Sequence, residues 1–142
     1  MDRTLGLKIQ LNYIQNGFVD LYSVKFPYRI NTNIDYVEYS WNTKLLHRPV
    51  QYSIRVVPHD SSILSLLQIP SIGILPLNVE TFEIAYRCIG IKAGKFDLHV
   101  NFNFTWPSSA NQTKVTLKQE KLCANREIRL AYGFCLIHLF RE

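Results

Sequence analysis

The chain has 142 residues, enough for one domain with its own hydrophobic core and without a metal or a dense disulfide framework. Hydrophobic residues make up 47% of the chain and aromatic residues 13%, which excludes an intrinsically disordered protein. The net charge of +5 suits an acidic partner, but the basic residues are scattered, so a soluble domain that happens to be basic is an equally good interpretation.

Apolar residues recur at every second position in a series of short segments, the pattern of β-strands with one buried face. The predicted strands are 7–13, 22–28, 37–41, 50–56, 82–88, 96–106 and one that begins at 115. Between them, residues 59–78 are less regular because Pro70, Gly73 and Pro76 break any long element, and one helical turn is expected at 63–67.

These strands predict an all-β fold, an antiparallel β-sandwich with at most short helical turns, because the connections are too short for crossover helices. A closed barrel is the alternative. The sequence shows no internal repeat and no second domain. The tail at 124–142 loses the alternation, and its structure stays open.

The longest predicted strand carries a signal for N-linked glycosylation. Asn103-Phe104-Thr105 is an acceptor triplet, and the alternation turns Asn103 toward solvent. A second triplet is Asn111-Gln112-Thr113. Such triplets also arise by chance, but together they favour an exported protein.

The sequence itself shows no targeting signal that would account for export. Leu7, Ile9 and Leu11 are separated by polar residues and form no signal-peptide core. The longest apolar stretch, 131–140, contains His138 and is about half the length that spanning a bilayer requires. We therefore expect a chain that does not itself span a membrane, and a gene product that is incomplete and lacks its leader.

Two of the three cysteines share the buried face of their predicted strands. Cys88 and Cys123 both point inward and could meet across the core, where a bridge closing a loop of about 35 residues stabilises by about 4 kcal/mol. The alternative is two free buried thiols in a cytosolic protein, and the glycan acceptors favour the oxidised state. Cys135 is left over, either without a role or for intermolecular pairing.

Signatures of catalysis are missing. The chain has no phosphate-binding or kinase loop, no G-x-S-x-G, no H-E-x-x-H and no C-x-x-C. The four histidines lie far apart in sequence without a partner at zinc spacing, so neither a metal nor a cofactor is expected. Asp97 and His99 share a wet face and could form a hydrogen bond, but without a nucleophile they predict a surface pair and no enzyme.

Nucleic-acid binding is not expected either. Base stacking needs exposed aromatic rings, whereas Phe102, Phe104 and Trp106 take the buried face of their strand.

A basic strip is a weaker candidate surface. Lys114 and Lys118 lie opposite the apolar face of the last strand and would join Arg126 and Arg129 if the tail folds back. Heparan-type polysaccharide suits such a strip on a secreted domain, although a plain solvated face is the more common outcome.

Several short motifs follow the order and spacing of one known family. They are Tyr13-Ile14-Gln15-Asn16-Gly17-Phe18-Val19, Tyr22-Ser23-Val24-Lys25-Phe26, Tyr39-Ser40-Trp41, Arg48-Pro49-Val50-Gln51-Tyr52-Ser53-Ile54, Gly73-Ile74-Leu75-Pro76, Glu80-Thr81-Phe82, Cys88-Ile89-Gly90, Phe96-Asp97-Leu98-His99-Val100 and Lys121-Leu122-Cys123. In this order, residues 5–123 resemble the WIF (Wnt inhibitory factor) domain, most closely that of Ryk/Derailed-type receptor tyrosine-kinase-like proteins. Lys95 departs from the acidic residue usual there, which puts a charge-based contact at that position in doubt.

The resemblance implies an extracellular module with a disulfide between Cys88 and Cys123 that binds Wnt proteins, at the cell surface as part of a larger receptor. It also places Asn111 where Ryk-type modules carry a glycan. The kinase-like domain of such a receptor is missing from this chain. As an alternative, the resemblance allows a secreted module that binds lipid or heparan sulfate and modulates Wnt or Hedgehog-class ligands.

The family further suggests a hydrophobic cavity between the sheets that takes a lipid or the acyl chain of a protein ligand. The aromatic residues that could line it are Tyr13, Phe18, Phe26, Trp41, Tyr52 and Phe82. Ordinary core packing is the simpler role for these rings.

Overall fold

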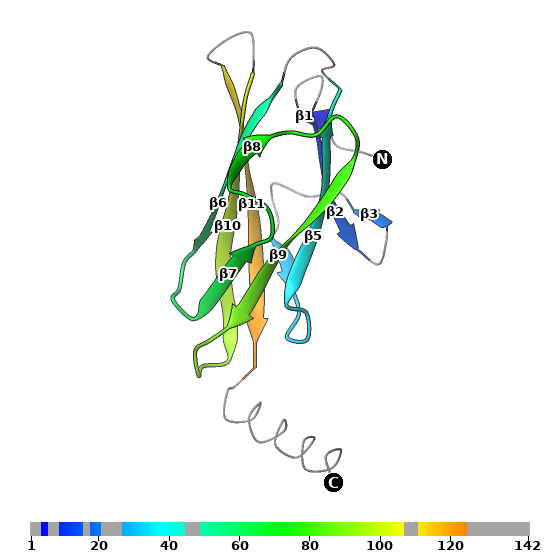
Figure 1. Ribbon diagram of the computed structural model, residues 1–142. Coiled ribbons are helices and arrows are strands. Elements are labelled where there is room, and N and C mark those ends of the chain that lie inside the picture. The colour runs from blue at the N-terminus through cyan, green and yellow to red at the C-terminus, as the bar shows by residue number, and fades with distance from the viewer. Residues whose placement is uncertain are drawn as a thin grey trace.

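The computed structural model describes residues 4–5, 9–15, 18–20, 27–44, 49–106 and 111–124. Within these residues the chain forms strands and no helix, and the strands make two sheets packed face to face (Figure 1). The predicted all-β sandwich is confirmed, and because the sheets are separate, the barrel alternative is not adopted.

The first sheet is antiparallel and ends at β7. Its spatial order is β1 (Thr4–Leu5), β2 (Ile9–Gln15), β5 (Tyr36–Thr43), β9 (Glu80–Cys88) and β7 (Ile63–Leu67), with β3 (Phe18–Asp20) paired to β2.

The second sheet has the two longest strands at its centre. Its spatial order is β4 (Tyr28–Ile30), β11 (Gln112–Cys123), β10 (Gly94–Thr105), β6 (Gln51–Pro58) and β8 (Ile72–Ile74). All its pairs are antiparallel except β4, which runs parallel to β11. The predicted strand 22–28 falls mostly outside the described residues, and β4 begins where that prediction ends.

The irregular stretch is where the sequence prediction is wrong. Residues 63–67 form strand β7 and no helical turn, because they pair with the edge of β9 and bury Ile63 while leaving Leu64 exposed. Gly73, which was expected to interrupt any long element, lies inside β8. A Cβ there would come within 2.8 Å of the Tyr52 ring, whose hydroxyl donates to the Pro70 carbonyl at 2.9 Å. The glycine therefore makes room for a side chain of the neighbouring strand.

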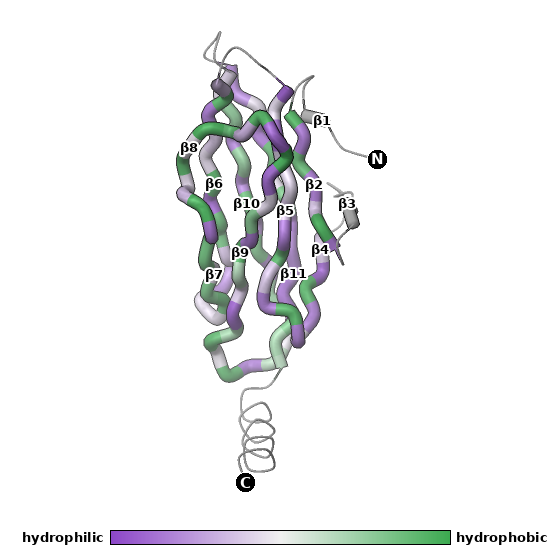
Figure 2. Tube along the Cα trace, turned by 45° about the vertical axis from the view of Figure 1, so that its right-hand side comes forward, coloured by the Kyte–Doolittle hydropathy of each residue, from purple (hydrophilic) through white to green (hydrophobic). Residues whose placement is uncertain are grey.

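The core lies between the sheets and is rich in aromatic rings. Hydropathy alternates along the strands in Figure 2, and Phe102 and Phe104 of β10 are almost fully buried. From the facing sheet, Trp41 packs on Phe82 with ring centroids 4.5 Å apart. Burial of this kind, at roughly 25 cal/mol per Å² of apolar surface, is the main stabilising contribution to the fold.

A disulfide joins the two sheets at one end of the sandwich. Cys88 ends β9 in the first sheet and Cys123 ends β11 in the second, with their Cα atoms 5.9 Å apart. The pair implied by the family resemblance is thus present, and it fixes both sheets where β9 turns toward β10.

The inward face of β11 turns polar before it reaches this disulfide. Lys121 points into the sandwich with its side chain 0% exposed, and its Nζ donates to the carbonyls of Asn31 at 2.8 Å and Ile34 at 2.6 Å. Asp35 lies 3.8 Å from the same nitrogen but is 73% exposed, so this ion pair adds little. Lys121 therefore holds the turn between β4 and β5 against the second sheet.

We expect Lys121→Met to lower the free energy of unfolding by about 1–3 kcal/mol, because two carbonyl groups of the turn lose a buried charged donor. Urea denaturation of both proteins measures the difference. Lys118→Met is the matched control, since Lys118 lies on the exposed face of the same strand and should change stability little. Equal midpoints for Lys121→Met and the unsubstituted protein would show that the lysine does not hold the turn.

Candidate functional site

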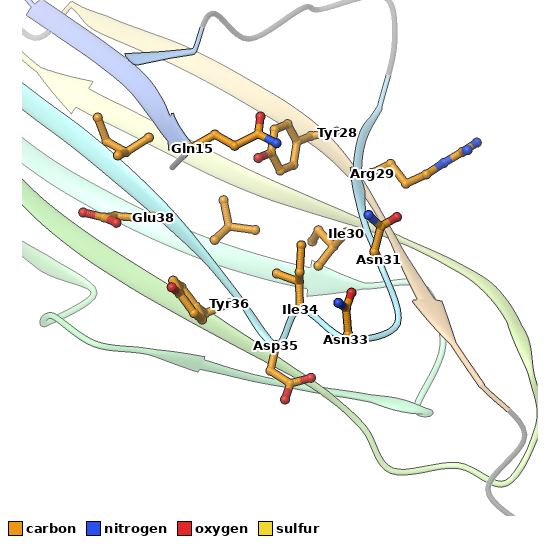
Figure 3. Close-up of a pocket in the computed structure, with 12 residues that line it drawn as sticks. Gln15, Tyr28, Arg29, Ile30, Asn31, Asn33, Ile34, Asp35, Tyr36 and Glu38 are labelled. Atoms are coloured by element: carbon orange, nitrogen blue, oxygen red, sulfur yellow. The ribbon is translucent and has the colours of Figure 1, made fainter. Parts of the chain in front are cut away.

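A pocket opens between the edges of the two sheets, and we call it the notch. β2 pairs with β5 only as far as Ile14 opposite Glu38, so Tyr36 and Val37 of β5 lie beyond the last pair that the two strands form. β4 of the second sheet lies across from this free edge of β5 (Figure 3). The notch has a volume of about 430 Å³, which is within the usual range of ligand pockets.

The notch combines apolar and polar side chains. Its lining residues are Ile14, Tyr28, Ile30, Ile34, Tyr36 and Val37, with Gln15, Arg29, Asn31, Asn33, Asp35 and Glu38. Arg29 points away in Figure 3, and its Nε lies 3.3 Å from a carboxylate oxygen of Glu120 on β11. The one cation of the lining is therefore directed out of the notch, toward Glu120.

Tyr28 separates the notch from a buried polar cluster. Its ring stacks on Tyr13 with centroids 4.2 Å apart. Behind Tyr13, Gln119 donates through Nε2 to the hydroxyls of Tyr13, at 3.3 Å, and Tyr39. The Tyr39 hydroxyl also lies 3.5 Å from that of Tyr86. These contacts fix the wall of the notch from inside the core.

Burial opposes ionisation of two phenols of this cluster, those of Tyr39 and Tyr86. Desolvation by burial is the largest cause of the raised pKa of Tyr39, and the neighbouring Tyr86 is the second. Desolvation is also the largest cause of the raised pKa of Tyr86. Gln119 Oε1 is buried, and among the described residues it accepts no hydrogen bond. The interior beside Tyr13 is therefore polar but uncharged, with one acceptor left over.

The aromatic residues predicted to line a lipid cavity lie in the core where the structure describes them. Trp41 contacts the rings of Tyr52 and Phe82 at centroid distances of 4.6 and 4.5 Å, and Tyr13 lies further along the same core. Phe26 and the side chain of Phe18 fall outside the described part of the chain. The lipid cavity stays a prediction, and in this conformation the rings pack on one another.

Basic side chains gather on the outer face of the second sheet, which we call the cationic face. Arg55 of β6 and Lys114 and Lys118 of β11 lie on it, on either side of β10. The ladder places Asn101 between Arg55 and Thr116, so polar groups fill the space between the cations. The other members predicted for this strip, Arg126 and Arg129, are outside the described residues.

The structure brings together two histidines that the sequence keeps apart. His59 follows the last residue of β6, His99 lies in the middle of β10, and the His59 Nε2 and His99 Nδ1 atoms are 2.8 Å apart. The partner that the structure gives His99 is therefore His59 and not the predicted Asp97. Sequence spacing missed this pair, because only the pairing of β6 with β10 joins residues 40 apart in the chain. No group of three metal-ligating residues occurs in the described ranges.

The two glycan acceptors have different surroundings. Asn103 lies on β10 between two neighbouring strands, its Nδ2 donates to Gln112 Oε1 at 3.1 Å, and its Oδ1 is buried. Asn111 is exposed just before β11, and its carbonyl accepts from the Trp106 backbone at 3.1 Å. Thr113, the third residue of the second triplet, accepts from the Trp106 indole at 2.7 Å.

Two sheets tied by a disulfide, with a pocket between their edges, define a β-sandwich module. The described part of the chain contains no helix long and apolar enough to cross a membrane.

Comparison with known proteins places this module in a family. The family model of the WIF domain matches residues 1–123, and the chain belongs to that family. The matched region is a WIF domain and not a kinase domain.

Curated relatives carry the same module. The chain is 41% identical to "Inactive tyrosine-protein kinase RYK" of Caenorhabditis elegans over 91% of its length. It is 27% identical to "Tyrosine-protein kinase Drl" of Drosophila melanogaster over 88%, and 24% identical to "Tyrosine-protein kinase RYK" of Mus musculus over 85%. The chain spans only about a fifth of each relative, 21, 21 and 20% of their lengths.

We expect Asn111 to be glycosylated more completely than Asn103. The exposed Asn111 stays accessible to the glycosylating enzyme, whereas Asn103 becomes less accessible once the central strand pairs with its neighbours. The measurement is the mass released by peptide N-glycosidase from protein secreted by a eukaryotic host. Asn111→Gln should remove most of that mass and Asn103→Gln little, with Asn101→Gln as a control that alters no acceptor. Equal losses for Asn103→Gln and Asn111→Gln would contradict this order.

Proposed function

We propose that this chain is an extracellular ligand-binding module that recognises Wnt proteins, as the WIF region of a Ryk-like receptor. The observation that carries the proposal is its membership of the WIF family together with its likeness to Ryk- and Drl-type proteins. Binding without catalysis agrees with a site built from aromatic, amide and carboxylate groups around a pocket.

The proposal assigns the protein ligand to the notch. Its walls are set before a ligand arrives, because Tyr28 stacks on Tyr13 and Lys121 holds the turn at 31–35. A preformed pocket avoids the entropy cost of ordering loops on binding. Tyr36 is half exposed at the opening and offers the kind of amphipathic ring that dominates protein interfaces.

An acyl chain on the ligand has a route into the module at the same place. Tyr28 lines the notch and stacks on Tyr13 of the core, so movement of its ring would open a path between the two. The lipid-binding hypothesis then becomes part of Wnt recognition, with the core rings of Trp41, Tyr52 and Phe82 as its inner lining.

We expect Tyr36→Glu to weaken binding of a purified Wnt protein about tenfold or more, because it places a charge where an aromatic contact is needed. Biolayer interferometry on the secreted, glycosylated chain measures the affinity. Ile72→Glu is the matched control, since Ile72 is 72% exposed on β8 at the other edge of the sandwich. A Cys88→Ser/Cys123→Ser variant should lose binding with the fold.

Other outcomes separate the location from the function. Loss of binding in Ile72→Glu and not in Tyr36→Glu would move the contact to the β8 edge and keep the Wnt proposal. No binding by a well-folded chain would reject Wnt as the ligand.

The cationic face favours a second candidate, a heparan-type polysaccharide. Arg55, Lys114 and Lys118 lie on the same face of the second sheet, and Glu120 at the border of this face forms an ion pair with Arg29. Clustered cations on a rigid sheet attract a sulfated chain, and salt screens this attraction.

We expect Lys114→Gln/Lys118→Gln to elute from immobilised heparin at clearly lower salt than the unsubstituted chain. Lys44→Gln/Lys92→Gln removes the same charge from exposed positions outside the cationic face and serves as the control. Equal shifts for the two double variants would mean that heparin responds to net charge only, and the polysaccharide site would be rejected.

A further inference from the structure

His59 and His99 meet on the outer face of the second sheet, at the end of the cationic face that Lys118 occupies. The His59 backbone N–H donates to the Asp97 carbonyl at 3.0 Å, so the β6–β10 ladder continues past Pro58. Residues 97 and 99 point to the same side of β10, and His99 therefore lies diagonally across from His59. The two rings are edge to face with centroids 4.3 Å apart, and the pair is exposed.

We propose that His59 and His99 form a two-histidine chelate for a divalent transition metal ion, with Cu²⁺ bound more tightly than Zn²⁺. Imidazole nitrogen is a preferred ligand for both ions, and copper leads the affinity order of the first-row divalent metals. The two nitrogens are already held close together by neighbouring strands of the ladder, so metal binding costs little conformational entropy.

The present distance is close to the one that a metal needs. Zn–N bonds of about 2.0–2.1 Å place two nitrogens of a tetrahedral ion about 3.3 Å apart. The nitrogens are now 2.8 Å apart, so the exposed rings need to separate by about 0.5 Å for the ion to enter.

Binding also fixes the tautomer of each ring. His59 must present Nε2 without a proton and keep its proton on Nδ1, whereas His99 must present Nδ1 and keep its proton on Nε2. In the present pair one of the two facing nitrogens carries the shared proton, so a neutral pair binds the ion after that one ring changes tautomer.

Charges beside the pair act in opposite directions. Asp97 is the residue opposite His59 in the ladder, and Lys118 is opposite His99. The carboxylate favours a cation and the ammonium opposes it. Since no third ligand lies within reach among the described residues, two or more coordination positions stay open for water or for a group of a binding partner.

The test is calorimetric titration of the full chain, prepared without a polyhistidine tag, with CuCl₂ and ZnCl₂. We expect one ion per chain, with Cu²⁺ tighter than Zn²⁺ and no heat from Ca²⁺ or Mg²⁺, which prefer oxygen ligands. His59→Asn and His99→Asn should each weaken binding at least tenfold, and the double variant should be little worse than either, because a chelate needs both rings.

Matched variants locate the ion. His47→Asn/His138→Asn removes the other two histidines and should leave binding unchanged. Asp97→Asn should weaken binding a few-fold, and Lys118→Gln should strengthen it. Nitrogen NMR of the unsubstituted protein gives an independent readout, since Zn²⁺ should shift His59 Nε2 and His99 Nδ1, even if a variant folds poorly.

The proposal is overturned if neither ion binds at millimolar concentration, or if binding survives in both single variants. Loss in only one of the two would reveal a single-histidine contact and reject the chelate. Because the pair lies outside the notch, these results do not depend on whether Wnt binds there.

Discussion

The inward-facing row of β11 holds the two sheets together, and its chemistry changes along the strand. Val115 and Leu117 pack into the apolar core, whereas the next inward residues, Gln119, Lys121 and Cys123, each make a different link. Gln119 reaches the tyrosines of the first sheet, Lys121 the turn between β4 and β5, and Cys123 the end of β9. Toward the disulfide-linked end of the sandwich, hydrophobic contact thus gives way to a hydrogen bond, a charged donor and a covalent bond.

These links explain why a pocket persists beside the edge of the sandwich. An open edge between two sheets would close if its strands were free to approach, since burial of apolar side chains favours contact. Here Lys121 fixes the turn that forms one wall, and the stack of Tyr28 on Tyr13 fixes another. The notch is therefore a consequence of polar groups placed inside the sandwich, where each of them needs its partner.

How much the sequence could predict follows from the range of the interactions. The period of two along β9 and β10 is local, so it identified the strands, their buried faces and the inward direction of Cys88. β7 and β8 are short edge strands that are extended because they pair with β9 and β6. The sequence did not predict them, because Pro70 and Gly73 interrupt the local pattern. The notch and the His59–His99 pair depend on which strands become neighbours, and no pattern within one segment contains that information.

Glycosylation would determine which of the proposed binding surfaces remain accessible. Asn103 lies in the ladder between Ser53 and Lys114, so a glycan there would cover the part of the cationic face around Lys114. Asn111 precedes β11 at the end of the same sheet, away from the notch, which is built on β2, β4 and β5. A chain modified only at Asn111 would keep the notch, the cationic face and the histidine pair accessible together. Modification of Asn103 would remove the polysaccharide surface and leave the notch open, so glycan occupancy alone can separate the two proposed binding activities.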